Sequence, residues 1–463
     1  MKRTVRRILL SFLTLLTVSS LILPATAGIV RVGKNLNIVP QSDRQLAETT
    51  VAIDPRNPSI IVAGAQDDRL QTCCPITGHR WHGYYRSTDD GKTWTRSLLP
   101  GFPGDNSPQG QSSPLQGFNL TSDPVLTFDR AGNVYYTGIA IQFAAPDLKG
   151  YTAFVAKYTD DGANYSGVTL ITSGTDKPWI AVDTSGGPND GNIYLVYIGI
   201  FTGKISGSIF TRSTDGASTF SKPILVPGAG YVTAVAVDQK GIVYVTSLGN
   251  GGTILVSKSI DGGVTLSSPV TAASGLNPLP QTDLIGNRFR IVTLPQMVAD
   301  NSGVFIVTDD NSTGTSDVLF IRSTNQGATW STPIRVNDVT AGQQFFPTIA
   351  VSGGIINVAW YDSRMQVNSN GTITALDVFY SKSLDAGATF SANVRITSAS
   401  FNPNIVTFSD FARHEAFIGD YNQIASTSTE AHLVWADTIN ACNTIDPVLG
   451  CIDQDMLTST LGL

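Results

Sequence analysis

The sequence predicts an all-β protein assembled from repeated sheets within one domain. A short pattern recurs six times, with serine first (Tyr158 in the second copy), an acidic residue two positions on, glycine about four on, and an aromatic or large apolar residue seven on. Successive copies begin 46 to 71 residues apart, and such self-similarity is typical of repeat architectures. Composition agrees, because only 14% of residues are charged and 44 are glycine. The copies are 87–94, 158–165, 213–220, 259–266, 323–330 and 383–390.

The repeated pattern has a physical rationale that involves no substrate. An aspartate side chain can bond backbone N–H groups two residues on, and glycine supplies the positive φ that a tight turn needs. The aromatic residue then buries its ring between neighbouring sheets. Asn325 replaces the acid in the fifth copy and can make the same local bonds. We therefore expect structural turns that carry no chemistry of their own.

The pattern resembles the Asp-box, also called the BNR repeat, of the sialidase superfamily of β-propellers. The resemblance rests on six copies spread from residue 87 to residue 390. It implies four-stranded antiparallel blades around a central channel. In that family the boxes join the third and fourth strands of a blade, on the face away from the ligand pocket.

A second repeat lies upstream of the boxes and sets the number of blades. It is a polar or acidic residue, often near proline, followed by an alternating apolar run that ends near aspartate, as expected for the innermost strand of a blade. Seven such units accompany the six boxes, so we predict a seven-bladed propeller rather than the alternative of six blades. The units are 48–54, 123–129, 176–183, 231–238, 295–300, 346–351 and 419–425.

The two ends of the chain explain the missing box. Residues 455–460 resemble a third strand, after which the sequence stops, and residues 29–32 resemble the fourth strands at 334–336 and 394–396. An N-terminal strand that completes the last blade would close the ring without an exposed edge.

Residues 1–27 have the features of a secretory signal peptide, so we expect a secreted protein whose mature chain is the single domain 28–463. A basic start precedes an apolar run and the cleavage site Ala25-Thr-Ala27. Removing the four basic residues of this segment changes the formal net charge from −6 to −10, which disfavours nucleic acid and anionic membranes as partners. We expect no membrane anchor and a monomer.

Four cysteines in an exported chain favour disulfides. Cys73 and Cys74 are predicted in a loop of the first blade, and Cys442 and Cys451 in the equivalent loop of the last. Two local bridges, Cys73–Cys74 and Cys442–Cys451, are one alternative. A crossed pairing that staples the seam is the other, and we favour it because a long loop restricts the unfolded chain most.

Acidic residues recur where innermost strands begin and second strands end, positions that meet at one mouth of a propeller channel. Carboxylates held close together shift each other's pKa, as hydrolytic and cation sites require. The alternative is that each acid caps a loop or pairs with a nearby arginine. The candidates at strand starts are Glu48, Asp123, Asp176 and Asp420, and those at strand ends are Asp67 and Asp362.

Sialidases carry a Phe/Tyr-Arg-Ile-Pro motif before the first box, whose arginine helps to bind the substrate carboxylate. This chain departs from the motif, because Glu48 stands in the corresponding stretch and Phe289-Arg290-Ile291 lies far downstream. We therefore do not expect sialic acid as the substrate. A different set of cations is predicted to bind substrate, namely Arg69, Arg290, Arg364 and Arg413.

These features predict a sialidase-like glycoside hydrolase that acts on extracellular glycans or glycoconjugates through paired carboxylates at the channel mouth. Catalysis is assigned to Asp67, Asp362 and Glu48, together with Tyr421 and Glu415, which resemble a tyrosine nucleophile with its acidic partner. Substrate binding is assigned to the arginines with Asp123, Asp176 and Asp420. The alternative is a non-catalytic propeller that binds glycan or protein, or mediates adhesion. We predict no cofactor, leave metal ligands unassigned, and consider a structural Ca²⁺ for the acid-rich mouth.

Overall fold

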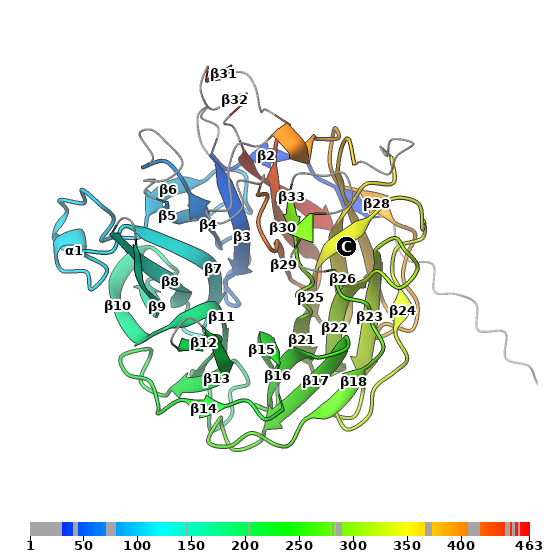
Figure 1. Cartoon of the computed structure of the whole chain (residues 1–463), viewed down its shortest axis with the longest axis horizontal. Helices are drawn as coiled ribbons and strands as arrows, with labels where there is room; N and C mark the ends of the chain where they lie inside the picture. Colours follow the sequence, from blue (N-terminus) through cyan, green and yellow to red (C-terminus); the bar gives the residue numbers. More distant parts are fainter. Residues whose placement is uncertain are drawn as a thin grey trace, which may run out of the picture.

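Four-stranded antiparallel sheets surround a central axis in the computed structural model, as Figure 1 shows. Their innermost strands contact one another in ring order, and the last touches the first. The prediction of a seven-bladed propeller is therefore confirmed. The described residues are 30–39, 45–70, 80–144, 147–201, 204–228, 230–279, 282–283, 289–365, 373–405, 417–439, 445–446, 450–451 and 454–463.

The first four blades follow the chain, each running from the channel outward. Blade 1 comprises β3 (Leu46–Ile53), β4 (Ile61–Asp67), β5 (Trp81–Ser87) and β6 (Thr95–Leu98). Blade 2 comprises β7 (Leu120–Phe128), β8 (Val134–Ala144), β9 (Asp147–Thr159) and β10 (Asn164–Ser173). Blade 3 comprises β11 (Thr175–Val182), β12 (Ile193–Phe201), β13 (Lys204–Ser213) and β14 (Ile224–Leu225). Blade 4 comprises β15 (Tyr231–Val237), β16 (Val243–Gly249), β17 (Thr253–Ser259) and β18 (Val270–Ala273).

Blades 5 and 6 repeat this plan. Blade 5 comprises β21 (Gln296–Asp300), β22 (Gly303–Asp310), β23 (Asp317–Ser323) and β24 (Ile334–Arg335). Blade 6 comprises β25 (Gln344–Ser352), β26 (Ile355–Asp362), β27 (Asp377–Ser383) and β28 (Val394–Arg395). Outside the blades lie α1 (Pro108–Gln111), the 3-10 helix η1 (Pro403–Ile405), and the paired strands β19 (Thr282–Asp283) with β20 (Arg290–Ile291) and β31 (Ile445–Asp446) with β32 (Gly450–Cys451).

Blade 7 joins the two ends of the chain. Its inner strands are β29 (Gln423–Ser426), β30 (Glu430–Asp437) and β33 (Asp455–Gly462), and β1 (Arg31–Val32) and β2 (Leu36–Asn37) both pair with β33. Val32 lies opposite Leu461 and Leu36 opposite Thr458. The predicted closure by an N-terminal strand is confirmed, with the outer position shared by two short strands.

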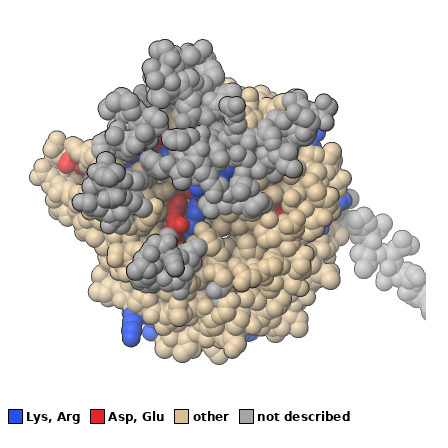
Figure 2. All heavy atoms as spheres, viewed as in Figure 1, with Lys and Arg blue, Asp and Glu red and all other residues tan. Residues whose placement is uncertain are grey.

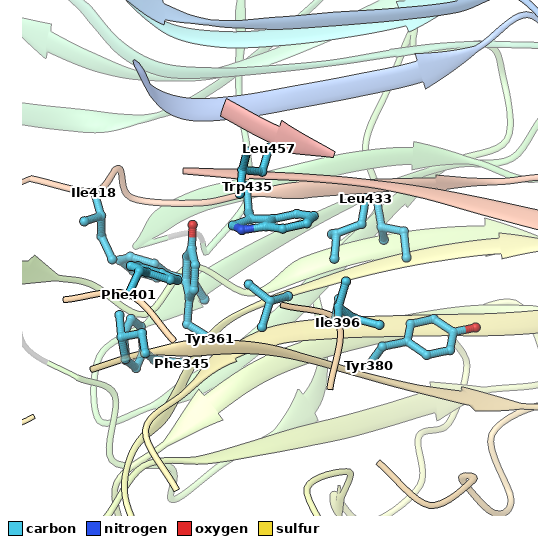
Figure 3. Packing of buried hydrophobic residues seen from close by; sticks show 14 of the residues in the cluster. Phe345, Tyr361, Tyr380, Ile396, Phe401, Ile418, Leu433, Trp435 and Leu457 are labelled. Atoms are coloured by element: carbon cyan, nitrogen blue, oxygen red, sulfur yellow. The ribbon is translucent and has the colours of Figure 1, made fainter. Parts of the chain in front are cut away.

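Buried side chains fill the spaces between blades. Figure 3 shows the cluster between blades 6 and 7, in which Phe345, Tyr361 and Trp435 pack beside Leu433 and Ile396. Alternation along each strand places apolar side chains on both faces of a blade, because both faces meet a neighbour. Each fully buried side chain of this size contributes about 1.5–3 kcal/mol.

The repeated pattern forms the turns between third and fourth strands, as predicted. In the first copy Ser87 Oγ accepts the Gly91 N–H at 2.9 Å, and Asp89 Oδ1 accepts the Thr93 N–H at 2.8 Å. The aspartate therefore reaches four residues along the chain, rather than the two we expected. Asn325 keeps the same bond, from the Thr329 N–H at 2.9 Å, so its replacement of the acid preserves the turn.

In one of these turns, glycine is required for space as well as for conformation. At Gly387, with φ of 78°, an added Cβ would lie 2.2 Å from Phe320 Cε1. Gly104 also has positive φ, at 87°, but a Cβ there would meet nothing within 4 Å. Gly387→Ala should therefore cost about 1–3 kcal/mol more than Gly104→Ala, because only the first adds a steric clash to the backbone strain. Thermal unfolding of both variants tests this, and equal shifts in melting temperature would contradict it.

Several sequence predictions fall outside the described residues. These are the signal peptide and the positions of Cys73, Cys74, Cys442, Arg413 and Glu415. Cys451 lies on β32, with its side chain also outside them, so the disulfide pairing stays a prediction. Within the described ranges, no helix has the length and apolar character needed to cross a membrane.

Candidate functional site

Several innermost strands begin with a β-bulge, and each of these bulges contains one residue with an unusual backbone conformation. The pairing register shifts at the start of β3, β7, β11 and β25, and these bulges contain Glu48, Asp123, Lys177 and Phe346. All four are non-glycine residues with positive φ, between 49° and 59°. A bulge redirects a side chain out of the strand's alternation, and such backbone costs of the order of 1–3 kcal/mol.

The charges at these positions are not needed by the bulge itself. Phe346 adopts the same backbone conformation with an apolar side chain that packs against Phe345 and Tyr361. The acidic and basic residues in blades 1 to 3 must therefore be explained by what their side chains contact.

Lys177 is at the centre of those contacts. Its Nζ lies 3.4 Å from Glu48 Oε1 and 3.6 Å from Asp123 Oδ1, and it also forms an ion pair with Asp420. Arg290, on β20, contacts the same Asp420 carboxylate, with Nε 2.9 Å from Oδ1. Figure 2 shows acidic and basic atoms side by side near the centre of one face. Blades 7, 1, 2 and 3 thus converge through one charged cluster, the mouth cluster, of Glu48, Asp123, Asp176, Lys177, Arg290 and Asp420.

Carboxylates also connect successive blades through backbone N–H groups. Glu48 Oε2 accepts the Asp123 N–H at 3.1 Å, and Asp123 Oδ2 accepts the Lys177 N–H at 3.1 Å. Asp309 accepts the Phe346 N–H at 3.4 Å in the same way. In each case a carboxylate binds the left-handed residue of the next blade. These bonds offset part of the backbone strain, so the acids have a structural role whatever their chemistry.

The carboxyl groups of the mouth cluster have pKa values that differ widely from one another. Burial raises the pKa of Glu48 to about 8, although Lys177 acts in the opposite direction. Burial, with the Asp123 charge, raises the pKa of Asp176 to about 7. Burial acts to raise the pKa of Asp123, but the Lys177 charge together with hydrogen bonds from Glu48 and Asp176 lowers it. Burial acts in the same way on Asp420, but the charges and hydrogen bonds of Lys177 and Arg290 together lower its pKa to about 2. Near neutral pH the cluster therefore combines a protonated Glu48 with ionised Asp123 and Asp420.

The structure brings together five of the predicted site residues, Glu48, Asp123, Asp176, Asp420 and Arg290. Asp67 and Asp362 have other partners. Asp67 Oδ2 lies 2.8 Å from Arg69 Nε and accepts the Tyr85 hydroxyl at 2.6 Å. Asp362 Oδ2 lies 2.9 Å from Arg364 Nε and accepts the Trp360 Nε1–H at 2.9 Å. Here the arginine-pairing alternative describes the geometry, and a catalytic role for Asp67 or Asp362 stays a prediction that these contacts do not favour.

Tyr421 is buried beside the mouth cluster. Its hydroxyl donates to the Pro124 carbonyl at 3.1 Å, its ring meets Trp179 edge-on at 5.7 Å, and Lys177 Nζ lies 5.8 Å from the ring centre. Burial and the charge of Glu48 keep the pKa of Tyr421 well above its usual range. A phenolate nucleophile is disfavoured by these contacts.

Lys177 is the main residue that sequence reasoning missed. Glu48, Asp123 and Lys177 each stand six residues before the aspartate that ends the repeat, at Asp54, Asp129 and Asp183. Counting back from that aspartate would have aligned the three positions. Choosing acids alone selected the neighbouring Asp176 instead.

The rest of the channel has an uncharged lining where the structure describes it. A cavity of about 350 Å³ is lined by residues of all seven innermost strands, after their bulges, from Val51 in blade 1 to Ser426 in blade 7. None of the lining residues that the structure describes is charged.

No metal site accompanies the mouth cluster in the part of the chain that the structure describes, where no group of three or more His, Cys, Asp or Glu is placed to hold an ion. Lys177 Nζ lies where three carboxylates converge. The structural Ca²⁺ stays a prediction.

No protein-family model matches the chain, and no curated protein matches it. Similar solved structures include a protein of unknown function from Dyadobacter fermentans, with a TM-score of 0.49, 13% identity and coverage of 94% of this chain and 99% of that one. The α-L-arabinofuranosidase of Fusarium graminearum has a TM-score of 0.47 and 12% identity, with coverage of 93% of this chain and 97% of that one. The sialidase of Trypanosoma rangeli has a TM-score of 0.39 and 13% identity, with coverage of 90% of this chain and 54% of that one. At such identities the likeness concerns the chain fold alone.

Proposed function

We propose that this propeller is a secreted glycoside hydrolase that cleaves glycosidic bonds of extracellular glycans at the mouth cluster. The six box-like turns, which resemble the Asp-box of the sialidase superfamily, are consistent with this class of protein. The proposal rests on one observation, the buried Glu48 carboxyl group that shares the Lys177 ammonium group with the carboxylates of Asp123 and Asp420.

Glu48 and Asp123 provide that pair. One oxygen of each lies 3.4 Å and 3.6 Å from the same Lys177 Nζ, so these two oxygens are at most about 7 Å apart. Two carboxyls whose environments separate their pKa values are suited to acid and base roles. We assign the acid to Glu48 rather than to Asp67 or Asp362, because those two are bound to Arg69 and Arg364.

The chemistry follows from these protonation states. Glu48, protonated near neutral pH, would donate its proton to the leaving glycosidic oxygen. Asp123 would act on the sugar as nucleophile, or as the base that activates water. The side chains of Lys177 and Arg290 are 12% and 14% exposed, against 1%, 6% and 0% for Glu48, Asp123 and Asp420, so hydroxyl groups of a sugar would meet the two cations before these three acids.

Glu48→Gln should reduce hydrolysis by about 10²- to 10⁴-fold, because the amide keeps the shape and loses the transferable proton. The wild-type rate should fall as pH rises through about 8, where Glu48 loses its proton. A panel of chromogenic glycosides and polysaccharides, with release of reducing ends as the readout, measures both.

Asp309→Asn is the matched control for Glu48→Gln. Asp309 is also buried, has a pKa raised by burial to about 7, and accepts the N–H of a left-handed residue in the next blade. It lies in blade 5, so its variant should keep the activity. Equal activity of wild type and the Glu48 variant would refute the assignment.

A non-catalytic glycan-binding propeller is the second candidate, and the blade-to-blade N–H bonds favour it. Carboxylates that serve to brace the mouth would leave a binding surface without turnover. Binding of a glycan with equal affinity by wild type and Glu48→Gln, with no hydrolysis by either, would support this function instead. Export remains part of the proposal, and a secreted protein that begins at Gly28 would support it.

A further inference from the structure

We infer that Lys177 is a positioning residue, which holds the carboxyl groups of Glu48, Asp123 and Asp420, from three other blades, in one fixed arrangement. The inference rests on the proposed function, since it names the residue that sets the geometry of that site. It also makes a claim about ionisation that can be tested without a substrate.

Both ends of Lys177 are held. Its backbone N–H is shared between Asp123 Oδ2 at 3.1 Å and Asp176 Oδ1 at 3.0 Å, and its φ of 49° fixes an uncommon conformation. Its ammonium group reaches the carboxylates of blades 1, 2 and 7, and its side chain is only 12% exposed. A lysine held at its backbone and at its Nζ cannot serve as a mobile surface charge.

Lysine also suits this position better than arginine. An ammonium group is a compact point charge with three donors that can be directed separately, whereas guanidinium is a flat fork that favours one carboxylate. Lys177 faces three carboxylates in different blades. Arg290 makes the fork-like contact, with Nε and Nη2 both on Asp420.

The charged and titratable groups around Lys177 explain its effect. They are Glu48, Asp123, Asp176, Asp420, Arg290, Tyr231 and Tyr421. Although burial acts the other way, Asp123, Asp420 and Glu48 keep the pKa of Lys177 well above its ordinary value, so it is charged throughout the working range. Without this charge, Arg290 would face the carboxylates alone, and the carboxylates would retain protons to higher pH.

Lys177→Met tests the inference, with Lys177→Arg as the charge-preserving variant and Lys258→Met as the control. Lys258 Nζ donates to the Gln326 carbonyl at 2.9 Å, far from any mouth-cluster contact. Carboxyl ¹³C NMR titration gives the midpoints of Asp123 and Asp420. The methionine variant should raise them by more than about one pH unit, the arginine variant should restore part of the shift, and the control should leave them unchanged.

The double variant Lys177→Met with Asp420→Asn removes one charge of each sign and remains testable if the single variant does not fold. It should recover folding, with the Asp123 midpoint still raised. Unchanged midpoints in Lys177→Met, or in its double variant with Asp420→Asn, would overturn the inference. Shifted midpoints in a protein without glycosidase activity would support Lys177 and contradict the proposed function. Hydrolysis with the same rate and pH profile in wild type and Lys177→Met would support the proposed function and contradict the role of Lys177.

Discussion

Deleting residues 28–40 is expected to open the ring and destabilise the whole propeller. The deletion removes β1 and β2 together with the residues that follow each strand, whose backbone bonds to β33 include Gly33 N–H to Thr460 O at 2.8 Å and Ile38 N–H to Met456 O at 2.9 Å. It also removes Ile38 and Val39, which are 0% and 3% exposed. Each of these side chains contributes about 1.5–3 kcal/mol by burial, and the deletion leaves an unpaired edge on β33.

Thermal unfolding monitored by tryptophan fluorescence measures this effect. The deletion should lower the melting temperature strongly and increase aggregation through the exposed edge. Val32→Ala is the control, because Val32 is 38% exposed and its truncation should change stability by about 0.5 kcal/mol or less. A deletion variant that melts with wild type would show that the ring does not depend on this closure.

Asp420→Asn is expected to cost about 3–5 kcal/mol, because it removes the carboxylate that both Lys177 and Arg290 contact within a buried cluster. The pH dependence has a defined sign. The folded-state pKa of Asp420, about 2, lies below the ordinary 3.8, so the stability it contributes is present above pH 4 and is lost as pH falls toward 2. The variant should therefore lose stability at neutral pH and approach wild type in acid.

Denaturant unfolding at pH 7 and near pH 2 measures both parts of this prediction. Asp338→Asn is a matched control, because Asp338 Oδ1 pairs with Arg364 Nη1 at 2.6 Å but is 47% exposed. An exposed ion pair contributes about 0–1 kcal/mol. If both asparagine variants lose the same stability, the mouth cluster is not the buried, mutually dependent network described above.

The fold was predictable because its signals are local and repeated. In five of the six turns, a serine and an aspartate or asparagine each accept an N–H group four residues further on. Alternating apolar runs form the innermost strands. Closure followed from counting units against turns at the two ends of the chain. None of these steps required knowing which side chains meet across the channel.

The site was predictable only in part, because its geometry depends on single positions. Acids at strand starts converge as expected, but the residue that joins them is a lysine in a bulge. Asp67 and Asp362 end the second strands β4 and β26, where we expected them to face the same mouth as the acids at the innermost-strand starts. What separates them is Arg69 and Arg364, two residues further on, whose side chains fold back onto them. A sequence pattern shows that an arginine follows each aspartate by two residues, but it does not show that the arginine side chain turns back toward the aspartate.

The protonation state of Glu48 tests the central claim most directly, because the proposed chemistry needs a proton on this carboxyl beside ionised Asp123. Carboxyl ¹³C titration, with the signal assigned by its loss in Glu48→Gln, gives the midpoint. The structure predicts a value near 8, because burial disfavours the charged form. A midpoint near the ordinary 4.5 would mean that Glu48 is ionised at neutral pH, and it would contradict the acid role and the account of the mouth cluster.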